Sequence, residues 1–275
     1  MVAVEEILGK YPYLLKGRCR FRPELAPFSC RARARLPENA ATILSFAIPY
    51  LVDVPQRNLS YYCIVPDYHL VLGQLLEEVC KELRLAYPAN CFEAFVDNSP
   101  LSEVEVAARS GLGVVGRHSL LITPRYGSFV FLGEIVTDLF LPVEETPVNG
   151  CEDCGLCAAA CPGGAIGAFG RVDTGRCLSH ITQKKGELAP WEASLIQKGG
   201  LCFGCDTCQL ACPHNHPLPV TPVQAFVCDV LPSIQLDTVQ GVYKKRAFGF
   251  RGLQTLVRNL HLLSEKEAGE NETSP

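Results

Sequence analysis

The residues of this chain best suited to chemistry are its cysteines, since nine of the fifteen fall between positions 151 and 212. The first group has the spacing CxxCxxCxxxCP and consists of Cys151, Cys154, Cys157 and Cys161. The second group is a shortened copy, CxxCxxxCP, made by Cys205, Cys208 and Cys212. In such a run a short loop supplies thiolates to one iron–sulfur cubane, and the fourth cysteine ligates the neighbouring cluster. The pattern therefore predicts two [4Fe-4S] clusters.

The second copy is one ligand short, and two cysteines compete for that position. Cys177 lies between the copies and Cys202 lies just before the second, and spacing alone leaves both open. Structural zinc is the alternative use of CxxC pairs, but the triple-cysteine run and the two CP endings favour clusters. The other cysteines are isolated, as is typical of small buried apolar residues: Cys19, Cys30, Cys63, Cys80, Cys91 and Cys228.

The composition around these motifs is that of a globular protein, with 48% hydrophobic and 20% charged residues in 275. Apolar runs are interrupted well before the roughly 18 to 20 residues that a membrane span requires, and Glu5 and Glu6 argue against a secretory signal. We therefore expect no membrane segment and a cytoplasmic location. The net charge of -4 argues against a generally basic nucleic-acid binder, although arginines gather at 18–35 and basic residues at 244–258.

The elements that must position these motifs follow from the hydrophobic pattern. Residues 40–50 form an apolar run rich in β-formers, which predicts a buried strand. Apolar residues at helical spacing over 68–85 predict a helix, and the sequence CFEAFVD at 91–97 predicts a second strand. Strands that alternate with helices over residues 1–145 predict an α/β layer.

The rest of this layer contains a helix and a hairpin. Ser99 and Pro100 have the types expected at an N-cap and a first turn, which predicts a short helix through Arg109. Two β-type runs, 119–123 and 128–137, are joined by Pro-Arg-Tyr-Gly and predict a hairpin.

The whole chain is therefore predicted to be α+β. An α/β domain over 1–145 precedes a ferredoxin-like module with two [4Fe-4S] clusters at 146–220. A helical closing segment over 221–264 and a disordered polar tail at 265–275 complete the division.

Several separate motifs share one resemblance. They are the run AATILSFAIPY at 40–50, the triplet Asp67-Tyr68-His69, Asp97 with Pro100, and the long stretch GLGVVGRHSLLITPRYGSFVFLGEIVTDL at 111–139. Together with the cysteine pattern and FRGLQTLVRNLHLL near the C-terminus, they resemble the epoxyqueuosine reductase family, cobalamin-dependent enzymes of tRNA modification. The resemblance covers about 37–262 and implies a cobalamin-binding, reductase-like α/β domain, with a cobalamin held between it and the cluster module.

The resemblance also implies a ligand set for each cluster. One cluster takes Cys151, Cys154, Cys157 and Cys212. The other takes Cys161, Cys177, Cys205 and Cys208, which leaves Cys202 out.

The same resemblance implies roles outside the cysteines. Reduction of an epoxide needs an acid for the leaving oxygen, which the cofactor lacks, and Asp97 matches the family's proton donor. Its alternative role is a solvated helix cap. The resemblance also implies contacts to substrate or cofactor for Asp67, Tyr68, His69, Arg125 and Tyr126. The alternative is that the first three are ordinary polar residues at a helix start and that the last two belong to an ordinary turn. We do not assign His69 as a lower cobalt ligand, because its spacing to Gly73 does not fit that motif.

Two departures from the family pattern bear on the substrate. The family has an arginine in the motif LxER where this chain has Val104, and valine cannot replace a forked donor. Helical repeats that help many members hold tRNA are also missing after His261. The leading hypothesis is reduction of epoxyqueuosine to queuosine in a tRNA anticodon stem-loop, with electrons from a low-potential donor such as a flavodoxin or ferredoxin. The alternatives are a cobalamin-dependent reductase of another small substrate and a non-enzymatic two-cluster electron carrier.

Overall fold

The computed structural model describes residues 2–168 and 170–272 and divides the chain into two compact units. Unit 1 comprises residues 1–49 and 68–152, and unit 2 comprises 50–67 and 153–275. The first unit therefore ends close to the predicted boundary at 145, but the excursion of 50–67 into unit 2 has no signal in the sequence. The predicted division at 220 stays a prediction, because both of its sides lie in unit 2.

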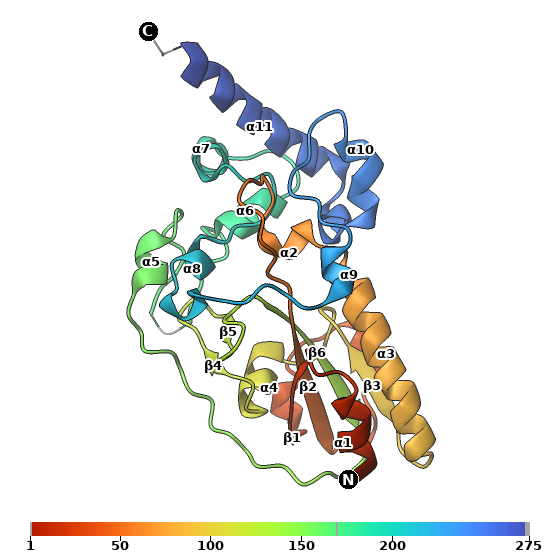
Figure 1. Ribbon diagram of the computed structural model, residues 1–275. Coiled ribbons are helices and arrows are strands. Elements are labelled where there is room, and N and C mark those ends of the chain that lie inside the picture. Colours follow the sequence, from red (N-terminus) through yellow and green to blue (C-terminus); the bar gives the residue numbers. More distant parts are fainter. Residues whose placement is uncertain (1, 169, 273–275) are drawn as a thin grey trace. The chain divides into compact units, whose positions relative to one another are not determined.

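Unit 1 is built on a four-stranded sheet in the order β1-β2-β6-β3, with every neighbouring pair antiparallel (Figure 1). The strands are β1 (Leu15–Arg20), β2 (Thr42–Pro49), β3 (Phe92–Phe95) and β6 (Val130–Thr137). All eight residues of β2 are buried, as expected of an apolar run at the centre of a sheet. The strand predicted at 40–50 is thus confirmed, and the sheet is antiparallel rather than parallel.

Helices cover both faces of this sheet. On one face lies α3 (Tyr68–Ala86), and a Cβ added to Gly133 of β6 would come within 2.8 Å of Leu76 of that helix. On the other face, α4 (Glu103–Arg109) buries Ala107 against Ala47 of β2. The remaining helices of the unit are α1 (Val2–Gly9), which packs on α3, and the 3-10 helices η1 (Pro23–Leu25) and η2 (Arg31–Arg35).

The prediction of a hairpin over 119–137 is wrong, because the two predicted strands do not pair with each other. The strand β5 (Leu121–Ile122) pairs with β4 (Val114–Val115), and β6 instead lies between β2 and β3. A single bridge joins Thr123 to Gly127, so the intervening loop closes on itself. The apolar length of β6 is buried better in the large sheet than in a two-stranded ribbon.

The helix predicted from Ser99 begins later than expected, because Ser102 is the N-cap of α4. The Ser99 hydroxyl instead accepts a hydrogen bond from the N–H of Leu101, at 3.1 Å. That local turn satisfies the serine side chain before the helix starts. It leaves Asp97 and Asn98 on a loop between β3 and α4.

Unit 2 is a set of short helices around the cysteine loops. They are α2 (Tyr61–Ile64), α5 (Leu156–Ala160), α6 (Leu178–Gln183), α7 (Pro190–Gly199), α8 (Thr207–Leu210), η3 (Pro213–Asn215), α9 (Gln224–Val227), α10 (Val239–Val242), η4 (Tyr243–Lys245), η5 (Ala247–Arg251) and α11 (Leu253–Glu272). Leu178, Ile181 and Ile196 form a core against Leu262 and Leu263 of α11.

Two expectations concern the end of the chain and the membrane. The tail predicted to be disordered from 265 is helical as far as Glu272, since α11 continues to that residue, and 273–275 lie outside the described residues. Within the described part of the chain, no helix has both the length and the apolar character needed to cross a membrane.

The segment 50–67 is tied into unit 2 beside the second cysteine run. Leu59 forms a parallel bridge with Phe203, and the backbone N–H of Tyr61 donates to the buried carboxylate of Asp206. Arg57 donates to the same carboxylate at 2.8 Å. Because Asp206 directly follows Cys205, these bonds fix the course of the loop that carries the cysteine.

Candidate functional site

Asp97 is the centre of a polar group on unit 1. It lies two residues beyond the end of β3, and its φ of +57° is unusual for a residue with a side chain. The Nε2 atom of His69, in the first turn of α3, lies 3.3 Å from an Asp97 carboxylate oxygen. Tyr68 also hydrogen-bonds Asp97. The structure therefore brings Asp97 together with the adjacent residues Tyr68 and His69, which lie far from it in the sequence.

These contacts set the charge on Asp97. The hydrogen bond from His69 lowers the pKa of the Asp97 carboxyl, and this effect outweighs the opposing effect of burial. The orientation of the Tyr68 ring is fixed by stacking on Phe131 of β6, with ring centroids 4.1 Å apart, and on His69, with ring centroids 4.0 Å apart. Since α4 starts at Glu103 with Ser102 as its N-cap, Asp97 does not cap that helix.

Two further carboxyls, which sequence reasoning missed, lie behind Asp97. Glu103 accepts a hydrogen bond from the backbone N–H of Asp97. Glu134, in the middle of β6, is fully buried. Burial, followed by the charge of Asp97, raises the pKa of Glu103 to about 8, and burial raises the pKa of Glu134 well above its usual range. The only sequence signal was a glutamate in the middle of an apolar β-run.

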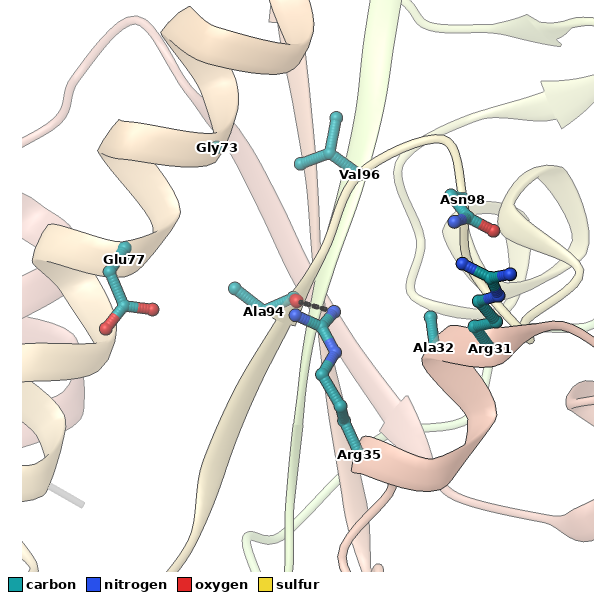
Figure 2. Close-up of a pocket in the computed structure, with 8 residues that line it drawn as sticks. All are labelled: Arg31, Ala32, Arg35, Gly73, Glu77, Ala94, Val96 and Asn98. Carbon is teal, nitrogen blue, oxygen red and sulfur yellow. Dashed lines mark hydrogen bonds between the residues drawn. The ribbon is translucent and has the colours of Figure 1, made fainter.

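A pocket of about 500 Å³ adjoins the Asp97 loop. Figure 2 shows Arg31 and Arg35 of η2 on one wall with Asn98, and Glu77 of α3 across from them. Arg35 donates to the carbonyl oxygen of Ala94 at 2.7 Å, which fixes its guanidinium at the pocket wall. The pocket therefore presents two guanidinium groups and an amide beside the loop that follows β3.

The remaining predicted contacts occupy other places. Asp67 is the last residue of the segment that belongs to unit 2. Arg125 and Tyr126 lie in the turn after β5, with the Arg125 guanidinium 5.0 Å from the centre of the Tyr126 ring. The Tyr126 hydroxyl is buried and has no hydrogen-bond partner among the described residues, and the same is true of Nε2 of His118. Burial lowers the pKa of His118 to about 4, so its imidazole is neutral.

The cysteines of unit 2 surround a common region. Cys157 lies in α5, Cys161 and Cys177 flank helix ends, and Cys208 lies in α8. Burial raises the pKa of Cys208 to about 12, together with smaller contributions from the neighbouring thiols of Cys205, Cys177, Cys161 and Cys157. Thiolates packed so closely repel one another unless a cationic group neutralises them.

Hydrogen bonds to the sulfurs support the same use. The backbone N–H groups of Ala165 and Arg117 lie 3.3 Å from the sulfurs of Cys161 and Cys151, respectively, and hydrogen bonds of this kind tune iron–sulfur centres. A cubane takes each thiolate at a separate iron. The donor set fits iron–sulfur clusters.

Cys202 makes contacts different from those of the other cysteines of unit 2. It is fully buried, and its thiol donates to the carbonyl oxygen of Leu256 in α11, at 3.5 Å. Such a contact is typical of a structural cysteine.

Comparison with known proteins agrees with this geometry. A family model described as "4Fe-4S double cluster binding domain" matches residues 150–215. The epoxyqueuosine reductase of Vibrio cholerae is 35% identical over 211 residues, which cover 76% of this chain and 57% of that protein. The epoxyqueuosine reductase of Lactococcus garvieae is 34% identical over 242 residues, which cover 81% of this chain and 68% of that protein. The chain belongs to the epoxyqueuosine reductase family.

Solved structures of epoxyqueuosine reductases share the fold. The structure from Streptococcus thermophilus superposes with a TM-score of 0.83 at 23% identity, covering 100% of this chain and 86% of that one. Another, solved with an epoxyqueuosine-modified tRNA stem loop, gives a TM-score of 0.79 at 24% identity over 94% of this chain and 79% of that one. The predicted α+β class and double-cluster module are confirmed. The chain spans little more than half the length of the first curated family members that it matches.

Proposed function

We propose that this epoxyqueuosine reductase family member reduces epoxyqueuosine to queuosine in a tRNA anticodon stem-loop, with two [4Fe-4S] clusters and cobalamin as cofactors. The observation that carries the proposal is the Asp97 group, in which a carboxyl with a constrained backbone is hydrogen-bonded by His69 and Tyr68. One of the similar structures holds an epoxyqueuosine-modified tRNA stem loop, which supports the same class of substrate for this chain.

The proposed role of Asp97 is to protonate the leaving oxygen. Loss of an epoxide oxygen as water requires a positioned acid, and Asp97 lies on a loop where its carboxyl, 59% exposed, can reach a bound molecule. His69 and Tyr68 orient that carboxyl. A carboxyl on an exposed helix cap would lack both partners.

The residues present fit the proposed cofactors. For the clusters, we propose the sets Cys151, Cys154, Cys157, Cys212 and Cys161, Cys177, Cys205, Cys208. For cobalamin, polar contacts are offered by the buried Tyr126 hydroxyl and His118 Nε2 in the stretch 111–139, neither of which has a hydrogen-bond partner among the described residues. Asp67 and Arg125 are proposed as further contacts. When bound, these groups would supply the two electrons of the reduction, received singly from a low-potential flavodoxin or ferredoxin. Reduced thiolates and a tRNA substrate fit a cytoplasmic location.

The pocket beside the Asp97 loop supports an RNA partner. Guanidinium groups bind phosphate oxygens through paired, charge-assisted hydrogen bonds, and Arg31 and Arg35 face this pocket together with Asn98 (Figure 2). A target base must be splayed from its loop to reach a buried reactive centre. We propose that the two arginines hold the backbone next to the splayed nucleotide.

One observation favours a second candidate, reduction of another small substrate. Val104 occupies the position where the family pattern has arginine, and it packs against the core cluster that contains Ala107 and Leu112. A valine turned into the core leaves no forked donor for the substrate. The second candidate predicts cobalamin binding without turnover of modified tRNA.

The test is anaerobic reconstitution of the full chain with iron, sulfide and cobalamin, followed by mass spectrometry of tRNA that carries epoxyqueuosine. Queuosine formation by the wild type, reduced roughly 10²- to 10⁴-fold in Asp97→Asn, is expected. Bound cobalamin with no product would favour the second candidate. Failure to bind cobalamin would overturn the reductase proposal.

A further inference from the structure

Behind Asp97, unit 1 buries carboxyl oxygens that lack the partners a buried charge needs. Glu134 is 0% exposed, and neither of its carboxyl oxygens has a hydrogen-bond partner among the described residues. One carboxyl oxygen of Glu103 is also buried and has no hydrogen-bond partner among the described residues. Ser45, directly opposite Glu134 on β2, is also 0% exposed with an unpartnered hydroxyl. Satisfied buried polar groups are the rule, so this cluster calls for an explanation.

The strand register shows where the cluster lies. Alternate residues of a strand face opposite sides of a sheet, and Gly133 faces α3, so Glu134 faces α4. Glu103 is the first residue of α4, and its carboxyl is bonded to the backbone N–H of Asp97. The three acids therefore form a series from the sheet to the candidate site: Glu134, Glu103 and Asp97.

The two inner acids hold protons at neutral pH. An ionised carboxylate without partners in a protein interior is strongly disfavoured, and the titratable groups that act on Glu103 are Asp97, His69 and Glu134. Burial raises the pKa of Glu103 to about 8. Asp97 behaves in the opposite way, because the hydrogen bond from His69 lowers its pKa.

We propose that Glu103, with the buried Glu134 beside it, is a positioning residue that stores a proton. It returns this proton to Asp97 after Asp97 has given its first proton to the substrate and before it gives the second. The inference rests on the proposed function. Loss of the epoxide oxygen breaks two C–O bonds and consumes two electrons and two protons, giving an alkene and water. Asp97 holds one proton at a time, so it must be reprotonated between the two deliveries and again before the next turnover. In this step Glu103 gives up its O–H proton and becomes a carboxylate, the Asp97 carboxylate takes up a proton, and Glu103 is then reprotonated from solvent, while Glu134 keeps its own proton.

Infrared spectroscopy of the full chain tests whether Glu103 holds a proton, and it needs no substrate. A protonated carboxyl gives a C=O band that a carboxylate or an amide does not give, so at pH 7 Glu103→Gln should lose one such band. Glu105→Gln is the matched control, because Glu105 is half-exposed on the same helix and pairs with Arg109, and its spectrum should equal that of the wild type. A Glu103→Gln spectrum that keeps every acid band would overturn the proposal. Should that variant not fold, loss of a band in Glu134→Gln decides in its place.

Turnover provides the second readout. Glu103→Gln should slow queuosine formation about 10²-fold, increasingly as pH rises, and Glu103→Asp should recover part of the rate. Turnover by Glu103→Gln equal to that of Glu105→Gln would contradict the role. If the wild type forms no queuosine, the proposed function fails, and the infrared result still decides whether Glu103 stores a proton.

Discussion

His69 and Asp97 are joined by a hydrogen bond across the start of α3 and the end of β3, with 3.3 Å between Nε2 and the carboxylate oxygen. The pair couples the helix that covers one face of the sheet to the loop that carries the proposed acid. Because the bond favours the ionised form of Asp97, it opposes the protonation that an acid catalyst requires. His69 therefore sets the pH range in which Asp97 can act.

We expect His69→Gln to shift the pH dependence of turnover upward. An acid catalyst loses activity as pH rises through its pKa, and removal of the His69 imidazole removes the main cause that lowers the pKa of Asp97. The falling limb of the rate profile should move to higher pH in the variant. The measurement is the queuosine formation rate against pH, with a ¹³C-NMR titration of Asp97 beside it. An unchanged titration of Asp97 would contradict this relationship.

We expect Glu134→Gln to stabilise the folded protein at alkaline pH. The pKa of Glu134 is raised in the folded state, so its contribution to stability is complete below the pKa of the unfolded chain and is lost as pH rises toward the folded value. Across that window the wild type should lose roughly 1.4 kcal/mol of unfolding free energy per pH unit from this group. Urea denaturation at several pH values measures the slope, and Glu105→Gln should leave it intact.

The elements that could be predicted from the sequence are those whose burial is local. The strand at 40–50 and the helix at 68–85 repeat apolar residues at their own period, and both appear as β2 and α3. The hairpin at 119–137 failed because the partner of β6 is set by contacts remote in sequence: Ala47 of β2 lies opposite Leu132. The same limit hides the excursion of 50–67 into unit 2.

The candidate site was predicted in part for the same reason. Asp97, Tyr68 and His69 were named because they lie in short motifs that carry the family resemblance, and the hydrogen bonds between them follow from the fold. Glu103 and Glu134 were missed, because nothing in the local sequence says that a charged residue has lost its solvent. Only the packing of α4 on the sheet creates that environment.

We expect replacement of both pocket arginines by alanine to weaken RNA binding and its dependence on salt. Each arginine that no longer neutralises a phosphate should reduce the slope of log affinity against log salt by about 1, so Arg31→Ala with Arg35→Ala should lower the slope by up to about 2. Affinity for an anticodon stem-loop across a salt series measures it. Lys198→Ala, an exposed charge on α7, is the matched control. Equal slopes for the double variant and the control would remove the pocket from the RNA surface.

Asn259 supports the last prediction, which concerns the cluster module. Its side-chain amide is fully buried in α11 and donates at 2.8 Å to the carbonyl oxygens of both Thr182 and Cys202. These bonds hold α11 against α6 and against the loop that leads to Cys205.

Asn259→Ala leaves both carbonyls buried without the donor, at a cost of about 1 to 3 kcal/mol for each group. We therefore expect a loss of several kcal/mol in unfolding free energy, together with faster release of iron from the reconstituted protein. His261→Ala, exposed on the same helix, should change neither quantity. An Asn259→Ala protein that keeps both its stability and its iron would show that α11 does not support the cysteine loops.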